Sequence, residues 1–113
     1  MNKKELNNFE KKLNYDDLIE RGCLIIEIAG KNVNKTSTIP GALTLKVNNI
    51  KKRTEQLRAS TRPILLTSHD QKSLIKASKQ LIAMKIECYN AGSPSNCYEQ
   101  LIAHQYVKIK TSQ

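Results

Sequence analysis

A run of side chains able to do chemistry lies between two apolar stretches and reads Ser68, His69, Asp70, Gln71, Lys72 and Ser73. Its first three residues have the types of a hydrolytic triad, but neighbouring residues in a loop splay apart, whereas each triad member must reach the next. We therefore expect no triad and interpret His69 as a solvated loop residue. Hydroxyls, the ammonium groups of Lys72 and Lys76 and backbone N–H groups at a helix start could instead hold a phosphate, sulfate or carboxylate. Asp70 has an alternative interpretation as the N-cap of the following helix.

Three cysteines, Cys23, Cys88 and Cys97, are the candidate nucleophiles and metal ligands. An odd number of cysteines without a secretory signal argues against a disulfide scaffold. No CxxC pair is present and the two histidines, His69 and His104, lie far apart, so we predict no metal site. Cys23 and Cys88 have apolar neighbours and are predicted to be buried, inert thiols. Cys97 follows a stretch rich in Gly, Ser, Pro and Asn, so we expect it to be the most exposed of the three.

The elements that must position these residues follow from the spacing of apolar residues. Short β-branched runs predict strands, and apolar residues three or four positions apart predict helices. We predict strands over 24–28, 43–45, 63–67 and 86–89, and helices over 14–22, 47–57, 72–84 and 98–106. The core-facing residues of the third helix are predicted to be Leu74, Ala77, Ser78, Leu81 and Ile82.

Strands that alternate with helices are typical of an α/β protein with a parallel sheet. The predicted fold is a three-layer sandwich, in which a mainly parallel sheet of four or five strands has helices on both faces. Ligands of such sheets bind beyond the carboxyl ends of the strands. The loop over 68–71, between a strand and a helix, is therefore the predicted functional site.

Length and composition fit one folded domain. The chain has 113 residues, of which 39% are apolar and 26% charged, so neither disorder nor a membrane span is favoured. We divide it into a polar segment over 1–12, a domain over 13–106 and a short polar tail over 107–113. The first segment lacks the apolar run of a secretory signal, so we expect a cytoplasmic protein with no membrane partner.

Positive charge is concentrated in the middle of the chain. The net charge is +9, and residues 31–85 hold 12 basic and 2 acidic side chains. Such a field favours anionic partners: phosphate ligands, acidic protein surfaces or nucleic acid. Solvated lysines that keep a small domain in solution are the simpler explanation. No aromatic side chains that could stack on bases are interleaved with the basic region, so nucleic acid is the least favoured of these partners.

Several segments resemble the rhodanese family of sulfurtransferases. Residues 39–42 read Ile-Pro-Gly-Ala and match the family's G-H-I-P-G-A element, and ungapped counting places Glu27 at the Asp of its D-V-R strand. Residues 63–67 match its P-I-V-V-Y strand, residues 15–22 its opening helix and residues 89–92 its strand-to-Gly segment. The resemblance covers nearly the whole chain and implies the family's fold.

The departures from the family pattern fall on the sulfur-transfer site. The family's catalytic Cys directly follows the P-I-V-V-Y strand, where this chain has Ser68, and a serine oxygen cannot form a persulfide. The other supporting groups of the family are replaced by His69, Gln71, Ser73, Ala29 and the pair Ser37-Thr38. The resemblance therefore implies a rhodanese-like fold whose sulfurtransferase site has been lost.

Three functional hypotheses remain open. The first is a non-catalytic binding or regulatory module, without a cofactor, that recognises an anionic ligand or an acidic protein surface through the loop over 68–73. The second is a sulfurtransferase that uses Cys97 as a displaced thiol, or a partner's persulfide. The third is a nucleic-acid binder that uses the basic region over 46–85. His104, on the last predicted helix, is interpreted as structural or merely exposed.

Overall fold

The computed structural model describes residues 13–30 and 39–104. The predicted terminal segments over 1–12 and 107–113 lie outside these ranges. The elements, in chain order, are α2 (Tyr15–Glu20), β1 (Leu24–Ala29), β2 (Leu43–Lys46), α3 (Val47–Ile50), a 3-10 turn (Lys51–Arg53), α4 (Thr54–Ala59), β3 (Ile64–Thr67), α5 (Gln71–Ala83), β4 (Cys88–Asn90) and α6 (Pro94–Ala103).

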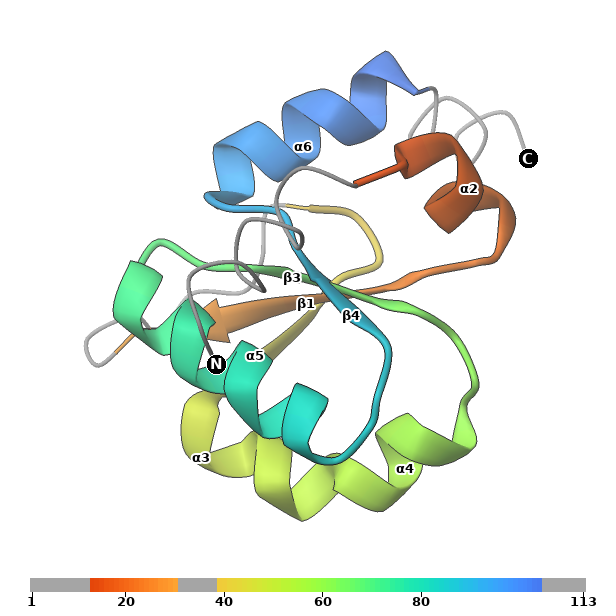
Figure 1. Cartoon of the computed structure of the whole chain (residues 1–113). Helices are drawn as coiled ribbons and strands as arrows, with labels where there is room; N and C mark the ends of the chain where they lie inside the picture. The colour runs from red at the N-terminus through yellow and green to blue at the C-terminus, as the bar shows by residue number, and fades with distance from the viewer. Residues whose placement is uncertain (1–12, 31–38, 105–113) are drawn as a thin grey trace.

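The architecture is a three-layer α/β sandwich (Figure 1). The described strands form one four-stranded sheet in the order β2-β1-β3-β4, and every neighbouring pair is parallel. Helices α3, α4 and α5 cover one face of the sheet, and α2 and α6 cover the other. The predicted fold class is therefore confirmed, with four strands in the part of the chain that the structure describes.

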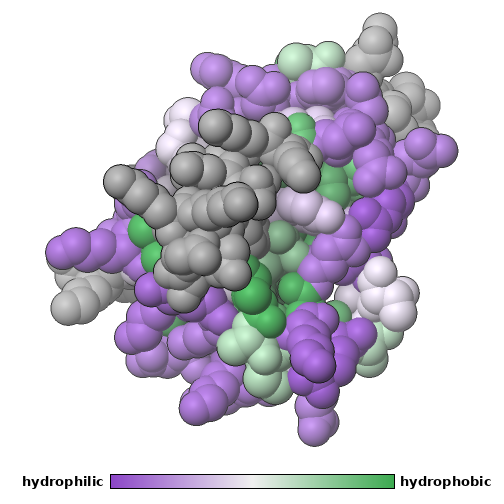
Figure 2. Space-filling model, in the orientation of Figure 1, coloured by the Kyte–Doolittle hydropathy of each residue, from purple (hydrophilic) through white to green (hydrophobic). Residues whose placement is uncertain are grey.

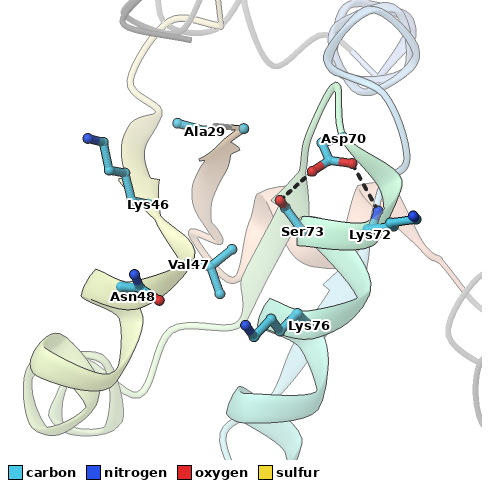
Figure 3. Close-up of a pocket in the computed structure, with 9 residues that line it drawn as sticks. Ala29, Lys46, Val47, Asn48, Asp70, Lys72, Ser73 and Lys76 are labelled. Atoms are coloured by element: carbon cyan, nitrogen blue, oxygen red, sulfur yellow. Dashed lines mark hydrogen bonds between the residues drawn. The ribbon is translucent and has the colours of Figure 1, made fainter. Parts of the chain in front are cut away.

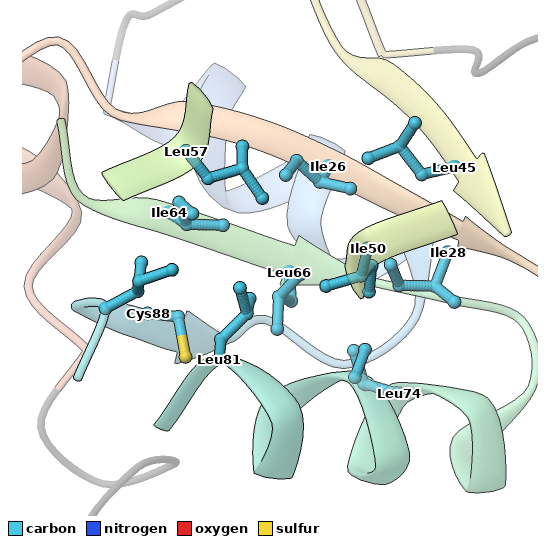
Figure 4. Packing of buried hydrophobic residues seen from close by; sticks show 12 residues of the cluster. Ile26, Ile28, Leu45, Ile50, Leu57, Ile64, Leu66, Leu74, Leu81 and Cys88 are labelled. Atoms are coloured by element: carbon cyan, nitrogen blue, oxygen red, sulfur yellow. The ribbon is translucent and has the colours of Figure 1, made fainter. Parts of the chain in front are cut away.

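Two apolar layers hold the sheet between its helices. Side chains of a strand alternate between the two faces, so Ile26, Ile28 and Leu66 pack toward α3–α5, while Ile25 and Leu65 pack toward α2 and α6. Figure 4 shows the first of these layers, where branched aliphatic side chains of the strands meet those of the helices. Both faces of the central strands are buried, which explains their continuous apolar runs.

Capping residues set the helix ends as the sequence indicates. Asn14 is the N-cap of α2, because its side-chain oxygen accepts a hydrogen bond from the Asp17 N–H at 3.1 Å. Gly22 follows the end of α2 with a φ of +69°, a backbone conformation that glycine adopts without steric cost. The predicted boundaries of this helix are therefore close to the observed ones.

The last part of the chain corrects two predicted boundaries. The final strand covers Cys88–Asn90 rather than 86–89, and α6 begins at Pro94, four residues before the predicted start at residue 98. The Ser93 hydroxyl accepts a hydrogen bond from the Asn96 N–H, and Pro94 occupies the first turn, where proline costs no hydrogen bond. The end of the Gly-, Ser-, Pro- and Asn-rich stretch before Cys97 therefore forms the first turn of a helix.

One predicted core residue lies at the surface. Ile82 is 38% exposed, whereas Leu81 beside it is buried against the sheet. The helix turns by about 100° per residue, and its apolar stripe is too narrow here to bury both side chains. Within the described ranges, no helix is long and apolar enough to cross a membrane.

Among residues 13–30 and 39–104, two residues other than glycine hold a left-handed backbone, Thr61 (φ 55°) and Lys85 (φ 60°). This conformation costs a β-branched residue such as threonine about 1–2 kcal/mol, because Cβ crowds the backbone. Thr61 is exposed, so its side chain can be removed without opening a cavity. The strain therefore offers a direct stability test.

Replacing Thr61 by glycine is expected to raise the free energy of unfolding by up to about 1 kcal/mol. The gain comes from the relieved left-handed backbone and is reduced by the greater freedom of glycine in the unfolded chain. Urea unfolding followed by circular dichroism measures it. The control Ala59→Gly, in helical backbone at the end of α4, should lose about 0.5–1 kcal/mol. A lower free energy of unfolding in both variants would contradict backbone strain at Thr61.

Candidate functional site

A cleft of about 390 Å³ opens at the carboxyl ends of β1 and β2, beside the start of α5. Its lining comes from three separate segments: Ala29 and Gly30 after β1, Lys46, Val47 and Asn48 at the junction of β2 and α3, and Asp70, Lys72, Ser73 and Lys76 around the start of α5. Figure 3 shows these segments surrounding one space.

The topology of the sheet explains why the cleft forms here. The chain leaves β1 toward β2 on one side, and it leaves β3 through α5 toward β4 on the other. Neighbouring connections that diverge in this way leave a crevice beyond the strand ends, where parallel sheets bind ligands. Gly30 brings the loop after β1 close to the start of α5, since a Cβ built on it would lie 3.5 Å from the Asp70 Cβ.

Ser68, at the position where the resemblance places the family's catalytic cysteine, is turned into the protein. It is 4% exposed, and its Oγ donates a hydrogen bond to the Ile28 carbonyl oxygen at 2.6 Å and accepts one from the Asp70 N–H at 3.0 Å. Its own N–H donates to the Gly92 carbonyl oxygen at 3.1 Å. Ser68 therefore joins the loop to the end of β1 and does not line the cleft.

Asp70 is the N-cap of α5, which confirms one of the two interpretations that the sequence left open for this residue. Its carboxylate accepts hydrogen bonds from the Ser73 hydroxyl at 2.6 Å and from the Lys72 N–H at 3.3 Å. The Ser73 hydroxyl, followed by the helix N–H groups, holds the pKa of Asp70 below its ordinary value. The N-terminus of α5, which is the positive end of the helix dipole, already faces the Asp70 carboxylate. An anion bound in the cleft would therefore be attracted mainly by the lysines.

Three lysines line the cleft. Figure 3 shows Lys76 reaching from α5 toward α3, with Lys46 and Lys72 at opposite margins. All three lysines are exposed, and of the described residues Asp70 alone contributes a carboxylate to the lining of this cleft. The local field is therefore positive and suits an anionic group.

The predicted loop and the observed cleft share only part of their residues. Asp70, Lys72 and Ser73 line the cleft, whereas Ser68 is buried and His69 and Gln71 are exposed outside its lining. Anion binding by the whole loop over 68–73 stays a prediction.

Residues 46–48 and Gly30 were missed as parts of the site, and Ala29 was named only as a departure from the family pattern. The proximity of these segments to α5 arises from the strand order, and nothing in the local sequence signals it. The one local sign that Lys46 could belong to a site was its position between a predicted strand and a predicted helix.

The three thiols are buried, which corrects the expectation that Cys97 is exposed. Cys97 is 0% exposed, because the early start of α6 places it inside the helix, on the face that packs against the sheet. Burial raises the pKa of the Cys97 and Cys88 thiols to about 12 each, and it also raises the pKa of Cys23. A reactive thiolate is therefore disfavoured at all three positions.

Glu27 is a buried acid in the centre of the sheet. It is 4% exposed and lies in register with Thr44 of β2 and Thr67 of β3. Among the described residues, its Oε1 has no hydrogen-bond partner. The sequence already indicated this burial, because Glu27 is the one acidic residue in the apolar run over 24–28.

His104 has a structural setting at the end of α6. Its ring stacks on that of Tyr15 with centroids 5.5 Å apart, and its Nδ1 lies 2.6 Å from the Asp16 Oδ1. These contacts join α6 to the start of α2, which agrees with the structural interpretation. Within residues 13–30 and 39–104, no group of three His, Cys, Asp or Glu side chains is arranged to hold a metal ion.

The fold and the cleft define a compact α/β domain with a four-stranded parallel sheet and a basic crevice at its carboxyl edge. Comparison of the chain with protein-family models, with curated proteins and with solved structures finds no match.

Proposed function

We propose that this chain is a rhodanese-like domain that lacks sulfurtransferase activity and binds an anionic group in the cleft between α3 and α5. The observation that carries the proposal is that Lys46, Lys72 and Lys76 all line a cavity of about 390 Å³ at the carboxyl edge of a parallel sheet. The ligand class is a small molecule with a phosphate, sulfate or carboxylate group, or an acidic side chain of a protein partner.

The absence of sulfur transfer is supported by the bonding of Ser68. In the resemblance to rhodaneses this residue takes the place of the persulfide-forming cysteine, and here its hydroxyl is buried and bonded to the Ile28 carbonyl. Cys97, the candidate displaced thiol, has a pKa of about 12 and no exposed surface. Neither group meets the requirement for an accessible, ionised nucleophile.

Anion binding is supported by the balance of charge around the cleft. Three lysines face one aspartate, and the Asp70 carboxylate already accepts hydrogen bonds from Ser73 and Lys72. An anion beside Lys76 gains the attraction of several ammonium groups in a partly enclosed space. The Asn48 side chain can add a hydrogen bond from the opposite wall.

The binding test is a titration of the full chain with inorganic phosphate, followed by amide chemical shifts. We expect shifts at Gly30, Asn48 and residues 72–76, and an affinity at least about fivefold weaker in Lys76→Ala. The control Lys52→Ala removes the same charge from the 3-10 turn, outside the cleft lining, and should change the affinity less than twofold. Equal losses in the two variants, or no shifts at the cleft, would contradict anion binding there.

The catalytic test is transfer of sulfur from thiosulfate to cyanide. We expect no activity from the natural chain. Activity that is lost in Cys97→Ala would overturn the non-catalytic proposal in favour of a displaced thiol. Activity gained in Ser68→Cys, with the natural chain inert, would support both the family assignment and the loss of its nucleophile.

A further inference from the structure

The two helical layers of the sandwich carry opposite charge. On one face, residues 47–59 and 71–83, which form α3, the 3-10 turn, α4 and α5, hold seven Lys or Arg and one acid. On the other face, α2 and α6 hold four acids and no Lys or Arg. Seven of the 12 basic residues in the middle of the chain therefore lie on the helices of one layer, which we name the basic face.

The basic side chains form two adjoining rows. Lys51, Lys52, Arg53 and Arg58 are exposed on the α3–α4 segment, and Arg58 reaches the carbonyl oxygen of Met84 after the end of α5 at 3.3 Å. The two segments lie next to one another below the sheet in Figure 1, and both pack on the same apolar layer. One partner can therefore contact both rows.

The second row belongs to α5. Lys72, Lys76 and Lys79 are exposed and recur at intervals of four and three residues, which aligns them along one side of the helix. Figure 2 shows hydrophilic side chains on the outer surface of this layer, while hydrophobic residues gather in the middle of the view. The row is opposite the buried residues of the helix, so it faces away from the core.

We propose that the basic face binds the phosphate backbone of double-stranded nucleic acid without reading its sequence. Seven exposed ammonium and guanidinium groups on the helices of one layer can contact several phosphates of a duplex. The helices of this face contain no aromatic residue, so they offer no platform on which unpaired bases could stack. A duplex therefore fits better than a single strand.

An acidic protein surface fits this face less well. Protein interfaces are anchored by buried apolar and aromatic side chains, and the large apolar side chains exposed on the described helices and caps of the basic face are Ile82 and Met84, neither of them aromatic. The acids of α2 and α6 repel a duplex from the opposite side, so it is bound in one orientation.

The test is fluorescence anisotropy of labelled 20-base-pair DNA and RNA duplexes of random sequence with the full chain. With about four phosphate contacts, the affinity should fall on the order of a hundredfold between 50 and 200 mM salt. Binding of both duplexes identifies the shared backbone, and binding of one alone identifies its helical form as part of the recognition. No binding at 50 mM salt, or stronger binding of the matching single strand, would overturn the proposal.

A matched pair of variants separates the face from net charge alone. Lys52→Ala with Lys79→Ala removes two positive charges from the basic face, both outside the cleft lining, and should weaken binding at least about fivefold and lower the salt slope by about 2. Ser95→Glu with Ile102→Glu adds two negative charges to exposed positions of α6 and gives the same net charge. Equal losses of duplex affinity in the two double variants would mean that net charge alone determines binding, and this would contradict binding at the basic face.

Competition identifies the polymer, and the cleft is tested separately. Displacement of the duplex by polyglutamate at equal charge concentration would contradict the nucleic-acid proposal in favour of an acidic protein.

The proposal does not depend on anion binding in the cleft, because Lys52 and Lys79 lie outside it. Loss of phosphate binding in Lys76→Ala therefore leaves the predicted effects at Lys52 and Lys79 unchanged.

Discussion

In the folded chain, Cys23, Cys88 and Cys97 should react with a disulfide reagent on the order of a thousandfold more slowly than in the unfolded chain. The reacting species is the thiolate, and a pKa near 12 at Cys88 and Cys97 leaves about one thiolate in ten thousand at pH 8. An ordinary cysteine with a pKa of about 8.5 is roughly one quarter ionised there. Burial also blocks the approach of the reagent, so reaction requires local or global opening.

The thiol measurement is the release of thionitrobenzoate from Ellman's reagent at pH 8, with and without urea. Ser95→Cys is the control, because it places an exposed thiol on α6, two residues before Cys97. We expect one equivalent from this variant to react rapidly while the three natural thiols remain slow. Rapid release from the natural chain that disappears in Cys97→Ala would show that α6 opens readily, and it would restore the displaced-thiol hypothesis.

The spacing of apolar residues was sufficient to predict the class of fold. Central strands such as β1 and β3 are buried on both faces, so their apolar runs are continuous and easily recognised. The helix α5 has a buried side and a charged side, and this difference marks most of its length. Alternation of such elements has few solutions other than a parallel sheet covered on both sides.

The details of the site depend on contacts between distant segments. Lys46 and Lys76 meet at one cleft because β2 and the connection from β3 to α5 lie on either side of the end of β1. Strand order is a property of the whole fold, so local spacing does not reveal it. The burial of Cys97 was missed for a different reason: a loop-like composition outweighed the helix-start signal of Ser93 and Pro94.

The inward orientation of Ser68 has a large expected effect on stability. Ser68→Ala should lower the free energy of unfolding by about 2 kcal/mol, because it removes one hydrogen bond to the buried end of β1 and another from the Asp70 N–H. Without the Ser68 hydroxyl, the Ile28 carbonyl oxygen loses a hydrogen-bond donor in a buried region where water cannot replace it. Urea unfolding at neutral pH measures the loss.

Ser95→Ala is the control for Ser68→Ala, because Ser95 is exposed in the first turn of α6 and its change should stay within about 0.5 kcal/mol. Phosphate affinity of the folded Ser68→Ala variant should be unchanged, since Ser68 does not line the cleft. An unchanged stability together with a weaker phosphate affinity would mean that the hydroxyl points into the cleft. Ser68 would then belong to the binding site, and its hydroxyl would not join the loop to the end of β1.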